Sequence, residues 1–167
     1  SKVVSKVKGE KGTTVELTVL RGEDAKEVTV TATRDTVQAQ TIEYKMMDDK
    51  IGYIRVSEFD TVTYDQYKEA LDDLEKQGMT GLVVDLRNNP GGSLSTVCDM
   101  LDLMLPKGLI VYTEDKNGKK TEMKSDEEHQ FTKPLAVLVN GNSASASEIY
   151  SGAIQDYGIG KIVGTQT

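Results

Sequence analysis

The chain has 167 residues, 37% of them hydrophobic and 28% charged, a mixture normal for one globular domain or for one domain with part of another. Its net charge of -7 opposes binding to nucleic acid, because that affinity depends on clustered Lys and Arg. The longest apolar runs are far shorter than the roughly 20 residues that cross a bilayer, and no basic, apolar leader opens the chain.

Residues 1–35 predict a short helix followed by a β-hairpin. Two runs of alternating residues, Thr14–Leu20 and Glu27–Ala32, flank a turn at Arg21–Asp24. A stretch of this length cannot hold an independent hydrophobic core. We therefore expect it to be the latter half of a small domain.

The next segment predicts strands on both sides of a helix. Gly52–Val56 is the clearest strand, and Thr63 with Gln66 has the spacing of a capping box that opens a helix. Gly78 is a typical stop for that helix. The continuous apolar run Gly81–Leu86 is typical of a strand buried on both faces.

The remainder of the chain continues the alternation of strands and helices. We expect a helix at Ser93–Leu105, a hairpin at Leu109–Met123 around Asn117-Gly118, a buried strand at Leu135–Val139, a helix at Ala144–Tyr157 and a strand at Lys161–Gly164. Such alternation predicts an α/β fold.

The chain has one cysteine and one histidine, and neither indicates a site. Cys98 lies among apolar residues and is interpreted as a small buried hydrophobe rather than a disulfide or metal ligand. His129 lies in the charged run Lys124–Gln130, which predicts a solvated loop. We therefore expect no metal ion and no cofactor, and a Ser-His triad has no convincing histidine.

Two strand-to-helix junctions carry residues that are too small to be there for packing. The first is Arg87–Gly92, whose glycines can leave backbone N–H groups free to bind an oxyanion. The competing interpretation is an ordinary turn that leads to a Ser93 cap. In open α/β sheets ligands usually bind beyond the carboxyl ends of the strands, where both junctions would lie.

The second junction is Asn140–Glu148. A serine at a helix start lies near the positive end of the helix dipole, and the next amide can stabilise a tetrahedral oxyanion, which describes Ser145 and Ala146. The competing interpretation makes these serines simple caps. Glu148 is expected to favour the helix N-terminus by its charge rather than to act as a base.

A serine nucleophile needs a base, and without a histidine the recurrent alternative is a lysine kept neutral by burial. Lys161 is the nearest lysine downstream, but its place after Gly158-Ile159-Gly160 favours a solvated position. We therefore expect the base to lie outside residues 1–167.

Together the two junctions carry a specific resemblance. The motif Asp85–Gly92 and the motif Ser143–Ile149, which follows Leu138-Val139-Asn140, resemble the carboxyl-terminal processing peptidases, which are tail-specific serine endopeptidases with a Ser-Lys dyad. The resemblance extends over roughly Thr36–Thr167.

The resemblance implies roles for individual residues. Ser145 would be the nucleophile, and the oxyanion hole would come from the backbone of Ala146 and of a glycine, either Gly92 or Gly91. Asp156, eleven residues after Ser145 on the same helix face, would support the site, and the competing interpretation is a solvent-facing aspartate in the last turn of the helix. The catalytic lysine would follow three positions after the end of this chain.

The resemblance also implies the domain organisation. Residues 1–35 would be the C-terminal half of a PDZ domain, which contributes a partial β-hairpin. Residues 36–167 would be a protease core of the ClpP/crotonase-like type, built from stacked strand-strand-helix units and truncated before the lysine.

The whole protein would be anchored in the bacterial envelope or exported, and would act on polypeptide substrates, as a homo-oligomer or with a regulatory partner protein. Residues 1–167 alone are expected to be inert.

Two other functions compete with this one. A peptide-binding or scaffolding protein could use the same fold with a degenerate site. A crotonase-type acyl-CoA enzyme would share the oxyanion hole but would not need a nucleophilic serine.

Overall fold

The computed structural model describes residues 2–36, 38–126 and 128–167. The chain divides into two compact units, Ser1–Gln38 and Ala39–Thr167. Among the described residues, no helix has the length and apolar character needed to cross a bilayer. The predicted domain identities, with a boundary after residue 35, stay predictions.

The first unit consists of a short helix and a hairpin, as the sequence predicts. Helix α1 (Lys2–Val7) precedes the antiparallel strands β1 (Thr14–Arg21) and β2 (Lys26–Thr33). The Arg34 guanidinium ties the helix to the hairpin, because its Nε donates to the Val7 carbonyl at 2.8 Å. None of the side chains described in this unit is fully buried, so the unit has no closed core of its own.

The second unit is built on one sheet in the order β3-β4-β5-β8-β9. Its strands are β3 (Ile42–Met46), β4 (Ile51–Val56), β5 (Gly81–Asp85), β8 (Leu135–Val139) and β9 (Lys161–Gly164). A short 3₁₀ turn, η1 (Asp48–Lys50), joins β3 to β4, which pair antiparallel. The other neighbours are all parallel. The predicted α/β fold is confirmed.

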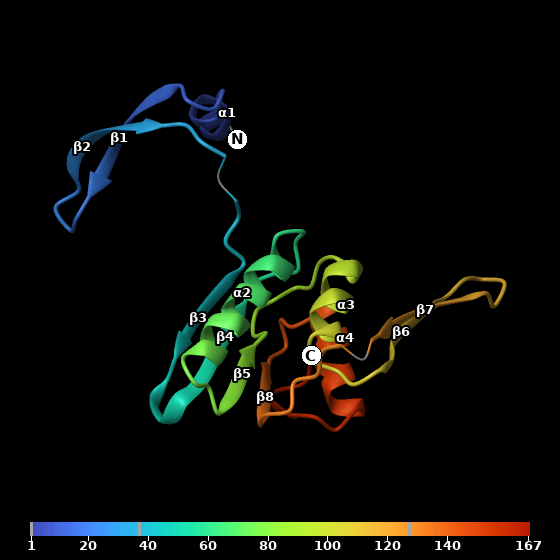
Figure 1. Cartoon of the computed structure of the whole chain (residues 1–167). Helices are drawn as coiled ribbons and strands as arrows, with labels where there is room; N and C mark the ends of the chain where they lie inside the picture. The colour runs from blue at the N-terminus through green and yellow to red at the C-terminus, as the bar shows by residue number, and fades with distance from the viewer. Residues whose placement is uncertain (1, 37, 127) are drawn as a thin grey trace. The chain divides into compact units, whose positions relative to one another are not determined.

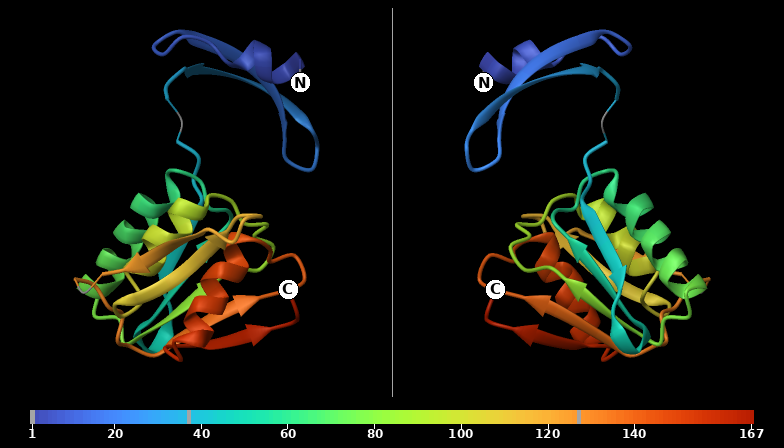
Figure 2. Two further views of the ribbon diagram at one scale, coloured as in Figure 1. Left: turned by 90° about the vertical axis from the view of Figure 1, so that its right-hand side faces the viewer. Right: turned by 90° about the vertical axis from the view of Figure 1, so that its left-hand side faces the viewer.

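Three helices cover one face of this sheet (Figures 1 and 2). They are α2 (Thr63–Lys76), α3 (Leu94–Asp102) and α4 (Ala146–Asp156). Each parallel connection moves one strand further in the same direction, and because such crossovers are right-handed, all three helices lie on the same side. Along β4 the covered residues are buried, whereas Tyr53 and Arg55 on the other face are only half-buried.

The start of α2 differs from the predicted capping box. Gln66 does not turn back to Thr63; its side-chain oxygen accepts from the backbone N–H of Thr41 at 3.0 Å. The Thr63 hydroxyl is bonded instead to that of Thr41, at 2.8 Å. The prediction was wrong because the segment that leads into β3 offers these two side chains partners that the helix end would otherwise supply. Gly78 does end the helix, with a φ of 83°.

Strands β6 (Gly108–Glu114) and β7 (Lys120–Ser125) form the predicted hairpin, which projects from the core (Figure 1). Cys98 is buried, as expected, and its Sγ lies 3.3 Å from the sulfur of Met123 on β7. His129 is exposed, as predicted, and Glu127 of the same charged run lies outside the described residues.

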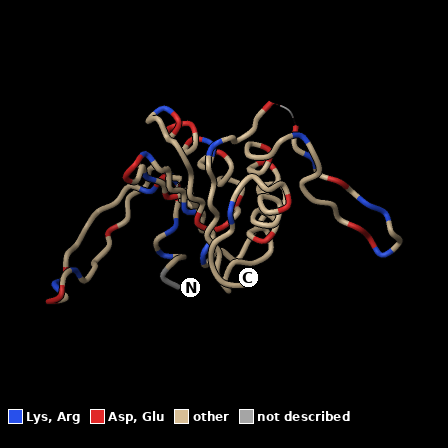
Figure 3. Tube along the Cα trace, turned by 90° about the horizontal axis from the view of Figure 1, so that it is seen from below, with Lys and Arg blue, Asp and Glu red and all other residues tan. Residues whose placement is uncertain are grey.

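Acidic and basic residues are intermingled along the chain (Figure 3). Both hairpins and α2 carry both signs, whereas the charged residues of α3 and α4 are all acidic. The net charge of -7 is therefore spread over many elements and is not concentrated on one of them.

Candidate active site

The two junctions that the sequence singled out leave the same edge of the sheet. β5 and β8 are parallel neighbours, with Asp85 opposite Leu138. Their carboxyl ends therefore lie side by side, and the turns that follow them, residues 86–93 and 140–145, meet there. We call these segments the glycine turn and the serine turn.

In the serine turn, Ser145 has an unusual backbone conformation. Its φ is 55° and its ψ is -116°, immediately before the first residue of α4. A residue with a Cβ rarely adopts such angles, because they cost free energy that the surrounding structure must supply. The backbone N–H of Ser145 donates to the Glu148 carboxylate at 2.8 Å, and Ser145 itself is exposed. Ser145 and Glu148 thus form a capping box, so the capping interpretation of this junction also holds, and an exposed serine lies at the positive end of a helix dipole.

The glycine turn is held against the segment after β4. The N–H of Phe59 donates to the Gly91 carbonyl at 2.9 Å, and the N–H of Ser93 donates to the Phe59 carbonyl at 2.7 Å. Gly91 and Gly92 have φ values of 107° and 142°. A Cβ on Gly92 would overlap the Phe59 carbonyl, so this position requires glycine. Ser93 also caps α3, accepting from the N–H of Thr96, so the capping interpretation of this junction holds beside the functional one.

The two turns are in direct contact. A Cβ built on Gly91 would lie 2.7 Å from the Cβ of Ser145 and 3.0 Å from the nitrogen of Ala146. The structure therefore brings together the nucleophile candidate and all three candidates for the oxyanion hole.

The two glycine amides are not equivalent. Gly91 is buried, and its N–H donates to the side-chain oxygen of Asn89 at 2.8 Å. Gly92 is exposed, and among the described residues neither its N–H nor that of Ala146 has a hydrogen-bond acceptor. Two unpaired N–H groups beside an exposed hydroxyl can hold an oxyanion.

Several polar residues that join the turns were missed by the sequence analysis. Ser143 is 1% exposed and donates from its hydroxyl to the Leu86 carbonyl at 2.7 Å. On the exposed side, the Asn140 side chain exchanges hydrogen bonds with Asn88 at 3.0 Å. Asn89, which is 0% exposed, makes a third link. Their only sequence signal is that they lie inside the two motifs.

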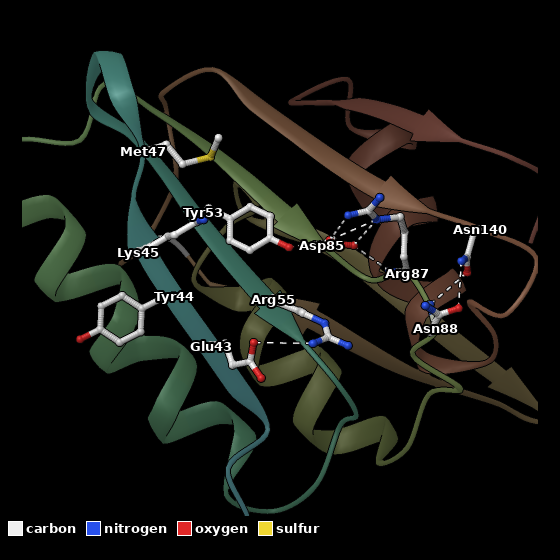
Figure 4. A pocket seen from close by; sticks show the side chains of 10 residues that line it. All are labelled: Glu43, Tyr44, Lys45, Met47, Tyr53, Arg55, Asp85, Arg87, Asn88 and Asn140. Carbon is white, nitrogen blue, oxygen red and sulfur yellow. Dashed lines mark hydrogen bonds and ion pairs between the residues drawn. The ribbon is translucent and has the colours of Figure 1, made fainter. Parts of the chain in front are cut away.

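A polar network lies on the open face of the sheet beside the turns (Figure 4). Asp85 accepts from the Tyr53 hydroxyl at 2.6 Å and forms an ion pair with Arg87, also at 2.6 Å. Burial acts to raise the pKa of Asp85, but the hydrogen bonds from Arg87 and Tyr53 outweigh it and hold this pKa below its ordinary value. The same pair raises the pKa of the Arg87 guanidinium, through its hydrogen bond to Asp85.

These residues border a surface pocket of about 830 Å³. The pocket is lined by charged, aromatic and amide side chains: Glu43, Tyr44, Lys45, Met47, Tyr53, Arg55, Asp85, Arg87, Asn88 and Asn140. Its cations are mostly paired with its carboxylates, since Arg55 also lies 3.6 Å from Glu43. Asn88 and Asn140 form the boundary between the pocket and the two turns.

The segment after β9 runs beside the serine turn. Gly164 packs so closely on Val139 that a Cβ would overlap the Val139 carbonyl. At the end of the segment the Thr167 hydroxyl donates to the Glu148 carboxylate at 3.0 Å. Glu148 therefore links this segment to the backbone of Ser145.

Two other candidates lie away from Ser145. Lys161 is exposed and begins β9 opposite Ala136, whereas Ser145 follows the far end of β8. Asp156 is exposed at the last residue of α4, which is about 16 Å along the helix axis from Ser145 at 1.5 Å per residue. Direct contact between Asp156 and the nucleophile is therefore not available in this arrangement.

Within the part of the chain that the structure describes, one group of side chains could approach a cation. Donor atoms of Asp126, Glu128 and His129 lie within 4.8 Å of one another, and all three residues are exposed. They lie in the loop after β7, outside the two turns, and we assign no ion to them.

Comparisons with known proteins give a consistent result. The family model "Peptidase family S41" matches residues 50–167. A carboxy-terminal processing protease CtpA of Bacillus subtilis is 36% identical over 168 residues, which is 100% of this chain and 36% of that protein. A carboxyl-terminal-processing protease of Synechocystis is 37% identical over 98% of this chain and 39% of its own length. The chain thus spans little more than a third of these curated relatives.

Solved structures agree with the sequence relatives. A photosystem II D1 C-terminal processing protease superposes with a TM-score of 0.68 at 29% identity, over 92% of this chain and 44% of that one. A putative S41 protease from Bacteroides fragilis, at 19% identity and a TM-score of 0.60, shows the same fold.

Proposed function

Because the chain belongs to peptidase family S41, we propose that the protein is a serine endopeptidase that cleaves polypeptides near their C-termini, with Ser145 as the nucleophile. One observation carries this proposal: an exposed serine in a strained conformation immediately precedes α4 and lies against the glycine turn, beside two N–H groups that have no acceptor among the described residues. Such an arrangement suits acyl transfer. The names of the relatives support the substrate class.

The proposed reaction proceeds through an acyl-enzyme. The Ser145 hydroxyl gives its proton to a base while its oxygen attacks the carbonyl carbon of the substrate. The N–H groups of Ala146 and Gly92 stabilise the resulting oxyanion, and Gly91 is less suited because its N–H is already bound. The C–N bond then breaks, the base returns the proton to the leaving amine, and water hydrolyses the ester to release the acid and Ser145.

We further propose that the base is a neutral lysine that follows Thr167 in the full-length protein. The position of Thr167 supports this idea, because its hydroxyl is bonded to Glu148, and Glu148 in turn accepts from the N–H of Ser145. Residues that follow Thr167 would therefore start close to the nucleophile. On this proposal, residues 1–167 alone show no turnover.

The wider organisation is also part of the proposal. The hairpin of the first unit would belong to a PDZ domain, and the parallel strands with helices on one face support a ClpP/crotonase-like core. Asp156 would support the site only indirectly, through α4. The whole protein would act in the bacterial envelope on unfolded or tagged polypeptides, as an oligomer or with a regulatory partner.

The experiment compares the full-length protein with its Ser145→Ala variant on an unstructured peptide with an apolar C-terminus. We expect kcat to fall by about 10⁴-fold or more in the variant, with an unchanged circular dichroism spectrum. Ser151→Ala, which removes a hydroxyl on the same helix but away from the turns, should keep full turnover. Equal turnover in the wild type and Ser145→Ala would rule out Ser145 as the nucleophile. A folded wild-type protein that binds the peptide without cleaving it would instead indicate a peptide-binding protein with a degenerate site.

A further inference from the structure

Asn89 occupies the point at which the glycine turn, the serine turn and the end of β4 meet. We propose that Asn89 is a positioning residue that selects Gly92 rather than Gly91 as the oxyanion donor and fixes its place relative to Ser145. This inference rests on the proposed function. Nothing in the family match or the relatives' names assigns a role to this residue.

The side chain of Asn89 is held by two hydrogen bonds. Its Nδ2 donates to the Val56 carbonyl at 2.9 Å, and its Oδ1 accepts from the N–H of Gly91 at 2.8 Å. Asn89 is 0% exposed, so water cannot replace either partner. Because an unmade bond is costly for a buried amide, this side chain has one acceptable orientation.

The backbone carbonyl of Asn89 binds both sides of the nucleophile. It accepts from the N–H of Ala144 at 3.1 Å and from the hydroxyl of Ser147 at 2.9 Å. These two residues lie immediately before and shortly after Ser145. One residue therefore fixes the glycine turn through its side chain and the serine turn through its backbone.

The hydrogen bond from Gly91 to Asn89 decides which of the two glycine N–H groups is available to an oxyanion. The N–H of Gly91 is buried and points to Asn89, whereas the N–H of Gly92 has no acceptor among the described residues. Without Oδ1, the buried N–H of Gly91 would need another partner, because buried backbone N–H groups are almost always bonded. The glycine turn would rotate to supply one, and the N–H of Gly92 would move with it.

A pair of substitutions in the full-length protein isolates this bond. Asn89→Ala and Asn89→Ser both lose the donor to the Val56 carbonyl. Only the serine keeps an oxygen that can accept from the N–H two residues later. A separate sample of each protein is first titrated to completion with a fluorophosphonate probe, which labels a reactive serine and so counts the competent active sites. Each kcat is then the rate divided by that number of sites.

We expect kcat per titrated site to fall about 10-fold to 10²-fold in Asn89→Ala with KM nearly unchanged, which is less than the roughly 10²–10³-fold loss on removing a donor outright. Asn89→Ser should recover most of kcat. Thr63→Val is the control, because it removes a buried hydroxyl that makes several hydrogen bonds at the start of α2, away from the glycine turn. It should leave kcat per site at the wild-type value. Equal kcat per site in Asn89→Ala and the wild type, or equal losses in the Ala and Ser variants, would overturn the inference.

A second measurement needs no variant and applies even if Asn89→Ala does not fold. The wild-type protein, labelled with ¹⁵N-glycine, is titrated with a peptide aldehyde that forms a hemiacetal with a reactive serine. The amide of Gly92 should shift and become protected from hydrogen exchange, while the amide of Gly91 is protected before and after. A response at Gly91 instead of Gly92 would show that the selection is wrong.

Ser145→Ala, measured in parallel, distinguishes a failure of the proposed function from a failure of the role proposed for Asn89. If it retains turnover, the proposed function fails. If it is inactive while Asn89→Ala has a wild-type kcat per site, only the role of Asn89 fails.

Discussion

The glycine turn and the serine turn follow neighbouring parallel strands, yet they meet the same geometric demand in opposite ways. At the two oxyanion candidates the glycine turn uses residues without a Cβ, Gly91 and Gly92, at positive φ values of 107° and 142°, and its Asn88, at 62°, is of a residue type that tolerates this region. The serine turn places a residue with a side chain, Ser145, at a φ of 55°. Glycine adopts such angles at little cost, whereas a side chain pays of order 1–3 kcal/mol.

On the proposed function, this difference follows from where side-chain chemistry is needed. An oxyanion donor is a backbone group, so its turn can be built from glycine. A nucleophile is a side chain, so its turn must carry strain and be held by its neighbours. Glu148 binds the N–H of Ser145, and Asn89 binds the residues on both sides of it.

The largest effect that tests this comparison is expected at Gly92. In the full-length protein, Gly92→Ala should lower kcat by about 10²–10³-fold, because the new Cβ would overlap the Phe59 carbonyl and displace the donor. Peptide cleavage per titrated active site is the measurement. Gly78→Ala has a similar positive φ of 83° but ends α2, and it should cost stability without changing kcat. If both alanines behave alike, the glycine turn has no special part in catalysis.

A smaller effect is expected on stability at Ser145. Ser145→Gly should be more stable to urea than Ser145→Ala by about 1 kcal/mol, because only glycine relieves the strain at positive φ. The matched pair at Ser95, an exposed position inside α3, should show the opposite order, since glycine weakens a helix by about 1 kcal/mol relative to alanine. The same order at both sites would mean that the serine turn is not strained.

The smallest effect is a pH dependence at Asp85, the last residue of β5, which directly precedes the glycine turn. The pKa of Asp85 is lowered by Arg87 and Tyr53 despite burial, and its unfolded value is about 3.9. The carboxylate therefore stabilises the fold above about pH 4, and this contribution is lost as the pH falls through the lower folded pKa. The difference in unfolding free energy between wild type and Asp85→Asn should shrink from pH 5 to pH 2.5.

Asp99 provides the control for this titration. Burial and the nearby Asp102 raise the pKa of Asp99, so its ionisation disfavours the folded state and the difference for Asp99→Asn should change with pH in the opposite direction. If the differences in unfolding free energy for the two variants change with pH in the same direction, Asp85 does not stabilise the fold as a paired carboxylate.

Periodicity and turn residues were sufficient to predict most of the elements. The buried strands β5 and β8 and the hairpin around Asn117-Gly118 depend on local patterns, and they form where those patterns indicate. The capping box failed because Gln66 finds its partner at Thr41, which directly precedes β3. Local spacing carries no information about such a partner.

Within the site, too, the local sequence does not show which partners come from elsewhere in the chain. Asn88 and Asn89 are identical neighbours in the sequence, yet Asn88 is exposed at a φ of 62° and Asn89 is fully buried. The buried partners of Asn89 come from β4 and the serine turn, so its role depends on the pairing of strands. By contrast, the small residues at the two strand-to-helix junctions drew attention to Ser145 and the glycines, and the resemblance of the two motifs to a peptidase family then favoured a functional role over simple turns and caps.

The bonds between Asn88 and Asn140 join residues 52 positions apart, and β8 must pair with β5 before the two turns can meet. During synthesis, β5 and its glycine turn emerge first, and the whole β6–β7 hairpin follows before the serine turn is made. A nascent chain therefore has no assembled site until its own core has closed. On the proposed function, a chain that is still being made therefore has no oxyanion donors beside Ser145 and would not cleave itself.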